Sequence, residues 1–240
     1  MATLAIIPAR GGSKRVPNKN TRPFLGVPLV SWTIRFARHL GLFDGIVVST
    51  DSTEIAEIAE EEGVPVPWRR PTELASDTAG SVEMALHAID QERLAGRTYE
   101  TIALLQPTSP VRLPQRWHDA FDRLATDNFT AAIGLIPASC HPFHTYSAEM
   151  SGLVRPFVDG GASLRKLRTQ ELPPAYAIGG NLYLIKAAAL KASNTFFPAH
   201  TAGVICDQPY EAFDIDTVAD WIAAEAIAQH HEQEPWPPSS

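Results

Sequence analysis

The stretch most suited to chemistry is residues 8–20, PARGGSKRVPNKN, which follows a short apolar run. It carries the four cations Arg10, Lys14, Arg15 and Lys19 in a chain whose formal net charge is −7. Two adjacent glycines allow a tight turn that brings backbone N–H groups close to a phosphate. A nucleoside triphosphate and a departing pyrophosphate both need such charge compensation. The spacing matches neither the P-loop nor the dinucleotide-binding pattern, and a solvated basic turn is the alternative.

The second candidate is an acidic pair, Asp214 and Asp216, within residues 213–217, FDIDT. Carboxylates at positions i and i+2 of an extended segment point to the same face, about 6–7 Å apart at the backbone. Their oxygens suit a hard cation, so we expect Mg²⁺ (or Mn²⁺) beside a triphosphate. Helix capping is the alternative, because Thr217 and Asp220 have the spacing of a capping box. Capping accounts for only one carboxylate of the pair.

Three further stretches look ordinary by composition. Residues 104–112, LLQPTSPVR, contain a turn, and residues 70–81, RPTELASDTAGS, predict a helix start capped by Thr78 or Ser81. Small residues in such a turn are suited to reading a base edge through backbone groups. Residues 168–183, RTQELPPAYAIGGNLY, begin with an arginine, a side chain suited to bidentate carboxylate recognition.

The alternation of predicted elements indicates how these stretches come together. Apolar runs predict strands at residues 3–8, 45–50, 64–66, 101–105 and 130–136. Helical spacing predicts helices at residues 29–40, 55–62, 80–95, 113–126 and 218–231. The pattern is typical of an α/β fold with a Rossmann-like, doubly wound, mostly parallel sheet. Ligands bind such sheets at the carboxyl ends of the strands, where most of the polar stretches lie.

The segment from about 138 to 200 interrupts this alternation. It is rich in Gly, Pro and aromatic residues, and we interpret it as an inserted arm, a subdomain for dimerisation or sugar binding. The chain is otherwise expected to form one domain over residues 1–231. Residues 232–240 are predicted to be a disordered tail.

Composition excludes several classes of partner. The negative net charge argues against nucleic acid and against an anionic membrane surface, both of which attract basic proteins. No stretch reaches the length of a membrane-spanning helix. Cys140 and Cys206 lack metal-site spacing and suit a reducing compartment. We therefore expect a cytoplasmic protein with small-molecule substrates.

Residues 7–20, IPARGGSKRVPNKN, resemble the signature loop of the acylneuraminate cytidylyltransferases, relatives of the 3-deoxy-manno-octulosonate cytidylyltransferases. The similarity extends to VSTD at 48–51, to QPTSPVR at 106–112 and to residues 168–183, and so covers most of the chain. It implies a homodimeric, magnesium-dependent nucleotidyltransferase. Such an enzyme joins CTP to a nine-carbon 2-keto-3-deoxy sugar acid and releases pyrophosphate.

The resemblance also implies roles for individual residues. Arg10, Lys14, Asp214 and Asp216 are expected to be catalytic, and the two aspartates to hold the metal. The expected nucleotide-binding residues are Ala9, Arg10, Gly11, Gly12, Ser13, Lys14, Asn20, Arg70, Ala79 and Ser81. The expected sugar-binding residues are Gln106, Arg168, Tyr183, Phe196 and Phe197. For Phe196 and Phe197, ordinary core packing is the alternative.

Three positions depart from the family's pattern in the sugar region. Ala177 stands where an arginine is frequent, Gly179-Gly180 replaces an Asn-Gly pair, and His144 replaces a lysine. These changes leave the sugar open among N-acetylneuraminate, a 5,7-diamino relative of the legionaminic or pseudaminic type, and a deaminated acid. An octulosonate or other sugar cytidylyltransferase is the nearest alternative, and a non-catalytic nucleotide-binding regulator on the same fold is another.

Overall fold

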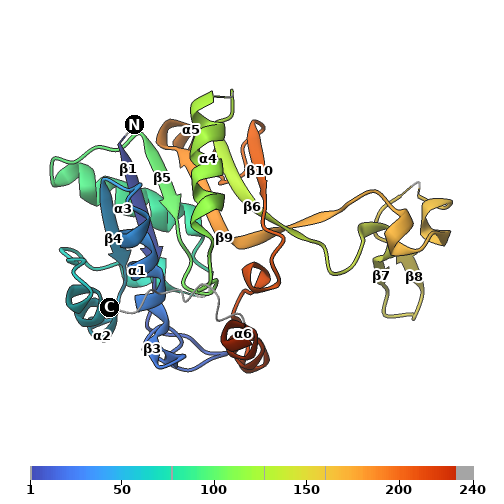
Figure 1. Ribbon diagram of the computed structural model, residues 1–240, viewed down its shortest axis with the longest axis horizontal. Helices are drawn as coiled ribbons and strands as arrows, with labels where there is room; N and C mark the ends of the chain where they lie inside the picture. Colours follow the sequence, from blue (N-terminus) through green and yellow to red (C-terminus); the bar gives the residue numbers. More distant parts are fainter. Residues whose placement is uncertain (1, 77, 127, 160, 231–240) are drawn as a thin grey trace.

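A six-stranded sheet forms the centre of the molecule, in the order β10-β6-β9-β5-β1-β4 (Figure 1). The computed structural model describes residues 2–76, 78–126, 128–159 and 161–230. The strands are β1 (Thr3–Pro8), β4 (Gly45–Ser49), β5 (Thr101–Leu104), β6 (Ala131–Pro137), β9 (Tyr176–Lys186) and β10 (Thr201–Ile205). Five strands run in one direction, and β9 is antiparallel to both of its neighbours. The predicted mostly parallel α/β sheet is confirmed.

Helices cover both faces of this sheet. They are α1 (Leu29–Leu40), α2 (Thr53–Glu61), α3 (Ser81–Leu94), α4 (Pro114–Thr126) and α5 (Ala187–Ser193), whereas α6 (Val218–His230) packs in a separate core. Strand β1 is apolar throughout, so successive side chains enter opposite cores. Ala5 and Ile7 pack with residues of α1, α2 and α4, whereas Leu4 and Ile6 pack with α3 and α5. This two-sided burial explains why the central strands read as continuous apolar runs.

A third core joins the segment that follows β1 to the segment around α6. Phe24 lies in the short pair β2 (Pro23–Phe24) and β3 (Val27–Pro28), which precedes α1. Its ring meets those of Trp32 and Trp221 edge to face, with centroids 5.2 and 5.6 Å away. Ile215 is buried in the same cluster. The loop after β1 and the acidic segment before α6 are therefore neighbours, although they are about 200 residues apart in the chain.

Residues 138–159 and 161–175 leave the sheet between β6 and β9 and project from the body (Figure 1). This arm carries the hairpin β7 (Tyr146–Ala148) and β8 (Val154–Pro156) and the short turns η2 (Pro142–His144), η3 (Leu164–Lys166) and η4 (Thr169–Glu171). The predicted arm of 138–200 was too long. Its second part forms β9, whose buried half follows Gly179-Gly180, and the helix α5.

Two local predictions were wrong. Residues 64–66 form no strand: Val64 and Val66 are buried, but Pro65 and Pro67 lack the N–H groups that a ladder needs. Helix α3 begins after Gly80 without a side-chain cap, so neither Thr78 nor Ser81 caps it. Within the described residues no helix is long and apolar enough to cross a membrane. The tail predicted at 232–240 lies outside the described residues.

Candidate active site

A cleft of about 410 Å³ opens at the carboxyl ends of β1 and β5. The loop after β1 forms one wall, and the start of α3 and the loop after β5 form the others. The lining residues are Pro8, Arg10, Ser13, Lys14, Arg15, Val16, Lys19, Asn20, Arg70, Leu74, Ser76, Ala79, Gly80, Ser81, Met84, Gln106, Pro107, Thr108 and Asp216. Lys14 and Asp216, predicted from opposite ends of the chain, thus share one cleft.

Polar contacts hold the glycine loop (residues 10–20) in place. The buried Asn20 donates from Nδ2 to the carbonyl oxygen of Arg10 at 2.9 Å. Gly11 donates its N–H to Asp51 Oδ1 at 2.9 Å, and a Cβ at Gly11 would lie 3.0 Å from the Cβ of Ser52. These contacts hold the loop against the turn that follows β4. Glycine is needed at position 11 for this close approach rather than for contact with the cleft.

Of the predicted nucleotide-binding residues, seven line the cleft and three do not. Arg10, Ser13, Lys14, Asn20, Arg70, Ala79 and Ser81 contribute to its walls. Ala9, Gly11 and Gly12 are not among the lining residues. Ala9 is completely buried and donates its N–H to Ser49 O at 3.0 Å, so its role is to extend the pairing of β1 with β4.

Two loop cations pair with the acidic segment. Arg15 Nη1 lies 3.0 Å from Asp216 Oδ2, and Lys19 Nζ lies 3.4 Å from Asp216 Oδ1. Lys19 also donates to the carbonyl oxygen of Ile215 at 2.8 Å. Burial lowers the pKa of Lys19, and the charges of Asp216 and Asp214 partly offset that effect. Lys19 was missing from the predicted site, although it belongs to the same basic loop.

The acidic pair flanks a buried residue, as its spacing predicted. Ile215 is completely buried, whereas Asp214 is exposed and Asp216 half-buried. The charges of both carboxylates act to raise the pKa of Lys19, so both lie within electrostatic range of that amine. The capping box is real, since Thr217 N donates to Asp220 Oδ2 at 2.7 Å and Asp220 N to Thr217 Oγ1 at 3.2 Å. Capping therefore uses the side chain of Asp220 and not those of Asp214 and Asp216; Asp216 pairs instead with Arg15 and Lys19.

The donor set at the pair fits a divalent cation bound together with a nucleotide. Among the residues that the structure describes, no group of three or more His, Cys, Asp or Glu side chains forms a self-sufficient metal site. Mg²⁺ keeps several waters and is usually held by one or two carboxylates plus phosphate oxygens. Asp216 shares the cleft with the cations Arg10 and Lys14, whereas Asp214 is not among the lining residues and lies next to Gly180, so the carboxylates of the pair would meet that requirement from the edge of the cleft.

Arg112 braces the loop that carries Gln106. Its fully buried guanidinium donates to the carbonyl oxygens of Gln106 and Asn181 and to Thr33 Oγ1, the last two at 3.1 and 3.2 Å. Burial lowers the pKa of Arg112 to about 9. The side chain holds the loop through backbone carbonyls and pairs with no carboxylate there. Gln106 is thereby fixed at the cleft with its amide beside Gly180.

Arg70 holds the opposite wall. The buried Arg70 donates from Nε to Ser49 Oγ at 3.0 Å, and its backbone N–H donates to Thr50 O at 2.8 Å. Burial lowers its pKa to about 10, while Asp51 acts in the opposite direction. Beyond Arg70 the wall consists of small residues at the start of α3, including Ala79 and Ser81.

The predicted sugar-binding residues are only partly assembled. Gln106 lines the cleft, and Tyr183 lies close enough to Asp214 for that carboxylate, together with burial, to raise the tyrosine's pKa. The Tyr183 ring centroid is 5.9 Å from Phe196 and 6.0 Å from Phe197. Phe196 is a core residue, whereas Phe197 is 44% exposed. None of the three aromatic residues lines the cleft itself.

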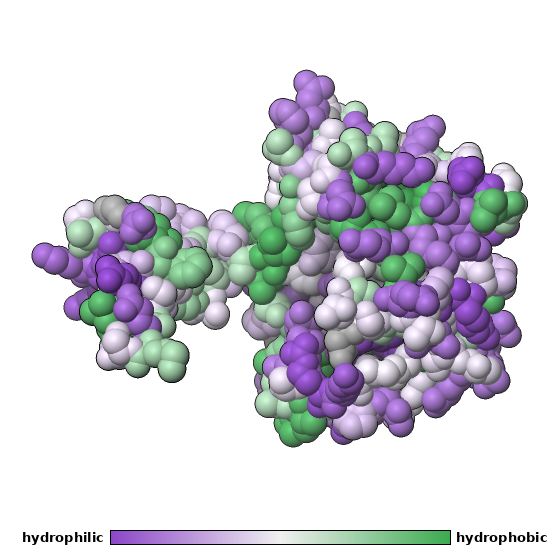
Figure 2. All heavy atoms as spheres, turned by 180° about the vertical axis from the view of Figure 1, so that it is seen from behind, coloured by the Kyte–Doolittle hydropathy of each residue, from purple (hydrophilic) through white to green (hydrophobic). Residues whose placement is uncertain are grey.

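Arg168 lies on the arm, which projects from the body (Figure 1), and it is not among the residues that line the cleft. Its side chain is exposed, and its backbone N–H donates to Glu171 Oε2 at 2.8 Å. Apolar side chains gather where the arm joins the body (Figure 2). There Leu135 pairs with Ile178 on one side and Ile205 on the other, and these isoleucines are 51% and 44% exposed. Arg168 thus does not share the cleft with Gln106 within one chain.

Comparison with known proteins gives consistent results. Residues 4–134 match the family model described as cytidylyltransferase. The chain is 32% identical to the CMP-N,N'-diacetyllegionaminic acid synthase of Legionella pneumophila, over 97% of this chain and 99% of that protein. It is 30% identical to a pseudaminic acid cytidylyltransferase of Campylobacter jejuni, over 92% and 93%. The solved CMP:2-keto-3-deoxy-manno-octonic acid synthetase complexed with CTP has the same fold, with a TM-score of 0.70 over 96% of this chain and 99% of that one at 13% identity.

Proposed function

Because the chain belongs to the cytidylyltransferase family and is therefore a nucleotidyltransferase, we propose that it joins CTP to a nine-carbon 2-keto-3-deoxy sugar acid and releases pyrophosphate. The observation that carries this proposal is the shared cleft of Lys14 and Asp216. One side supplies cations for a triphosphate, and the other supplies carboxylates for a divalent ion. The long sequence similarity to enzymes that make CMP-linked nine-carbon acids supports the substrate class.

The residues of the cleft divide the work as follows. Arg10 and Lys14 bind the phosphates of CTP and stabilise the charge that develops on pyrophosphate as the bond between the α- and β-phosphates breaks. The anomeric hydroxyl of the sugar acid attacks the α-phosphorus in line with that bond. Asp214 and Asp216 would hold Mg²⁺, which when bound polarises phosphate oxygens and orients the triphosphate. Arg15 and Lys19 hold Asp216 in place from the glycine loop.

The wall of Arg70, Ala79 and Ser81 is proposed to receive cytosine. The start of α3 offers backbone groups next to small side chains, which leaves room for a pyrimidine and can reject a purine by size. Uracil presents the opposite donor and acceptor at the position of the cytosine amino group, so the same backbone groups discriminate against UTP.

We propose a 5,7-diacylamino acid of the legionaminic type as the sugar. The Legionella pneumophila relative, whose name states that product, aligns over nearly the whole chain. The loss of an asparagine side chain at Gly179 is consistent with a pocket that differs from that of N-acetylneuraminate enzymes. Asp214 lies next to Gly180, because a Cβ built there would be 3.7 Å from Asp214 Cγ. The sugar acid is thus expected between Gln106, Gly180 and the acidic pair.

We further propose that the enzyme is a homodimer in which the arm of one chain completes the sugar site of the other. Two observations support this: Arg168 does not line the cleft that Gln106 lines, and the arm exposes Met150, Leu153 and Phe157. Burial of such side chains in a second copy removes apolar surface from water. We place the reaction in the cytoplasm, in keeping with the two free thiols.

The test is a pyrophosphate-release assay that offers each of the four nucleoside triphosphates against a panel of 2-keto sugar acids. The expected result is turnover with CTP and a nine-carbon 5,7-diacylamino acid, dependent on Mg²⁺. Turnover with the eight-carbon octulosonate alone would replace the proposed sugar, and CTP binding without turnover of any acid would favour a regulatory role.

A further inference from the structure

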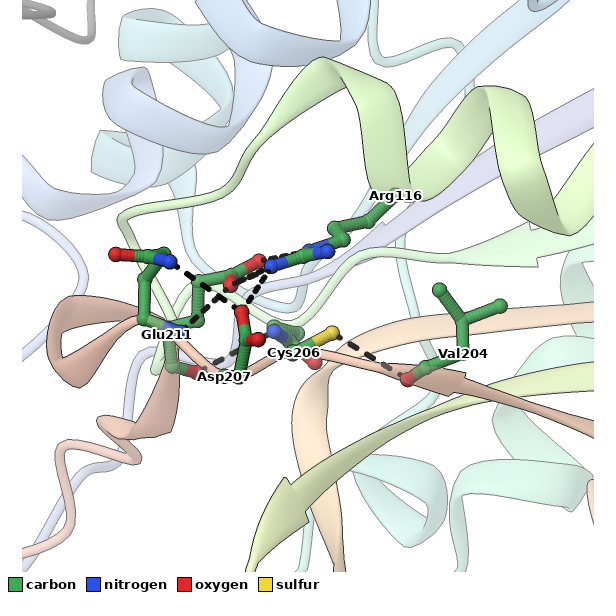
Figure 3. Close-up of polar contacts among 7 residues, drawn as sticks. Arg116, Val204, Cys206, Asp207 and Glu211 are labelled. Carbon is green, nitrogen blue, oxygen red and sulfur yellow. Dashed lines mark hydrogen bonds and ion pairs between the residues drawn. The ribbon is translucent and has the colours of Figure 1, made fainter.

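Arg116 and Asp207 lie around the buried side chain of Glu211, which precedes the acidic pair in the chain (Figure 3). Arg116 of α4 points its guanidinium at Glu211, which belongs to the short turn η5 (Pro209–Ala212). Arg116 Nη2 lies 3.0 Å from Glu211 Oε2, and Arg116 Nε lies 3.2 Å from Oε1. The same Nη2 lies 2.6 Å from Asp207 Oδ1. The Glu211 side chain is fully buried, so this carboxylate depends on its arginine for charge compensation.

The Glu211 carboxylate also shapes the turn that bears it. Gln208 N donates to Glu211 Oε2 at 3.2 Å, and Glu211 N donates back to Gln208 O at 2.9 Å. Asn181 of β9 donates from Nδ2 to the Glu211 carbonyl oxygen at 3.3 Å. The turn is therefore tied to α4 by its side chain and to the central sheet by its backbone. Asp214 follows only three residues after Glu211.

The other end of the acidic segment has its own anchors. Ile215 N donates to Thr108 O at 2.8 Å, and Lys19 Nζ donates to Ile215 O at the same distance. The segment between Glu211 and Ile215 is thus held at both ends by hydrogen bonds and ion pairs. Asp214 lies within it, and its position depends on where both ends are held. Since Arg116 and Glu211 do not line the cleft, they can affect the reaction only by positioning other residues.

We propose that the Arg116–Glu211 pair is a positioning device that holds the Asp214–Asp216 carboxylates in register with the Gln106 loop for divalent-ion binding. This inference rests on the proposed function, because it assigns the positioning to the proposed metal seat. Residues that orient metal-binding carboxylates commonly affect metal affinity or activity by about 10–100-fold without touching the metal. The same magnitude is expected here.

The chain contains a matched control for a merely structural role. Glu92 of α3 has a side chain that is 2% exposed and pairs with Arg97 at 2.6 Å. It is as buried as Glu211 and also paired with an arginine, but neither residue of this pair lines the cleft or contacts the acidic segment. Glu92→Gln and Glu211→Gln therefore remove comparable carboxylates. Glu92 has no contact with the acidic segment, whereas Glu211 lies in the turn that precedes Asp214.

The experiment compares wild type, Glu211→Gln, Glu92→Gln and Asp216→Asn. Calorimetry measures CTP binding across a titration of MgCl₂, pyrophosphate release measures turnover over the same titration, and thermal melting reports the folded fraction. For Glu211→Gln we expect the half-saturating Mg²⁺ concentration to rise about 10–100-fold in both titrations, with CTP binding in the absence of Mg²⁺ close to wild type. Arg116→Lys, which keeps the charge but loses the fork, should show a smaller rise.

A Glu211→Gln protein that melts earlier but keeps the wild-type Mg²⁺ dependence, as Glu92→Gln should, would overturn the positioning role. Asp216→Asn separates this failure from failure of the proposed function. If Asp216→Asn loses the Mg²⁺ effect while Glu211→Gln retains it, the metal seat stands and the positioning device falls. If Asp216→Asn retains the effect, the metal seat itself is wrong and the device falls with it.

Discussion

The cleft and the arm are held in place in different ways. Each wall of the cleft is braced by a buried polar residue, such as Asn20 under the glycine loop and Arg112 under the Gln106 loop. The arm has few buried residues and exposes large apolar side chains, including Met150 and Phe157. The residues proposed to bind the nucleotide are therefore mostly assembled within one chain. The sugar half acquires Arg168 only if something brings an arm to the cleft.

This contrast separates the two substrates. Changes in the cleft should act on the chemistry and on CTP in every chain independently. Changes in the arm should weaken binding of the sugar acid. A second chain that carries an intact arm should restore that binding.

The largest effect is expected from Asp216→Asn, which removes a charge from the cleft and leaves the arm unchanged. Loss of one carboxylate removes half of the proposed metal seat, so kcat should fall about 10²–10³-fold, as when a principal charge stabiliser is removed from an active site. The fold should persist, because Ile215 and the Thr217–Asp220 cap remain. Pyrophosphate release and circular dichroism measure the two quantities.

Asp90→Asn is the control for this change, because Asp90 is an exposed carboxylate that pairs with Arg93 on α3. It should leave turnover unchanged. Near-normal turnover of Asp216→Asn itself would refute the metal assignment.

The next largest effect is expected from Arg168→Ala on the arm. Loss of a charge-assisted contact to the sugar's carboxylate costs about 1.5–3 kcal/mol, which corresponds to a rise of about 10–100-fold in the KM for the acid. The KM for CTP should stay close to wild type, since Arg168 is remote from the nucleotide cleft. Steady-state kinetics with each substrate varied in turn measures the difference.

Mixing subunits tests where Arg168 acts. A mixture of Arg168→Ala and Asp216→Asn chains, unfolded and refolded together, should regain activity, because one site in each mixed dimer takes its cleft and its arm from intact copies. Each variant refolded alone is the control. If the mixture stays as inactive as its components, Arg168 does not act across a dimer.

How far the sequence predicts this molecule depends on the distance over which residues interact. The glycine loop and the acidic pair were found because each is a short run of unusual residues, and the structure brings the loop cations and Asp216 to one cleft. The apolar runs of β1 and β5 identified the sheet for the same reason. Strand β9 was assigned to the arm because Gly179-Gly180 interrupts its apolar pattern.

Contacts between distant residues were not predictable in this way. The Arg116–Glu211 pair joins residues 95 positions apart, and neither belongs to a recognisable motif. The contribution of Lys19 was overlooked although its loop was identified, because its partner Asp216 lies 197 residues further on. Lys19 and Asp216 become neighbours because the third core, around Phe24 and Trp221, packs their two segments together.

A smaller effect is expected from Gly180→Ala, which sharpens the boundary between the two halves. A Cβ at this position would lie 2.7 Å from Ser109 Oγ and 3.1 Å from Gln106 Oε1. Overpacking of this kind costs about 1–3 kcal/mol, and here it displaces the Gln106 side chain. The KM for the sugar acid should rise about tenfold.

Gly203→Ala is the control for Gly180→Ala, since its Cβ would meet Leu135 Cδ1 at 2.5 Å on the edge strand β10, away from the cleft. It should lower the melting temperature and leave both KM values unchanged. Equal effects of the two variants on the KM for the acid would show that Gly180 is a packing residue only.

The smallest effect concerns the two thiols, one in the arm and one in the body. Cys140 is exposed, whereas Cys206 is completely buried beside Glu211, and burial raises the pKa of its thiol to about 11. The thiolate is the reactive form, so at pH 8 a thiol reagent should modify Cys140 rapidly and Cys206 only after unfolding. Because the raised pKa keeps Cys206 protonated in the folded state, its contribution to stability is present below about pH 9 and is lost as the pH rises towards 11. Modified thiols are counted in wild type and in Cys140→Ser, before and after addition of denaturant. Rapid modification of Cys206 in the native protein would contradict the contrast drawn here, because it would show that the body around Glu211 opens as readily as the exposed arm.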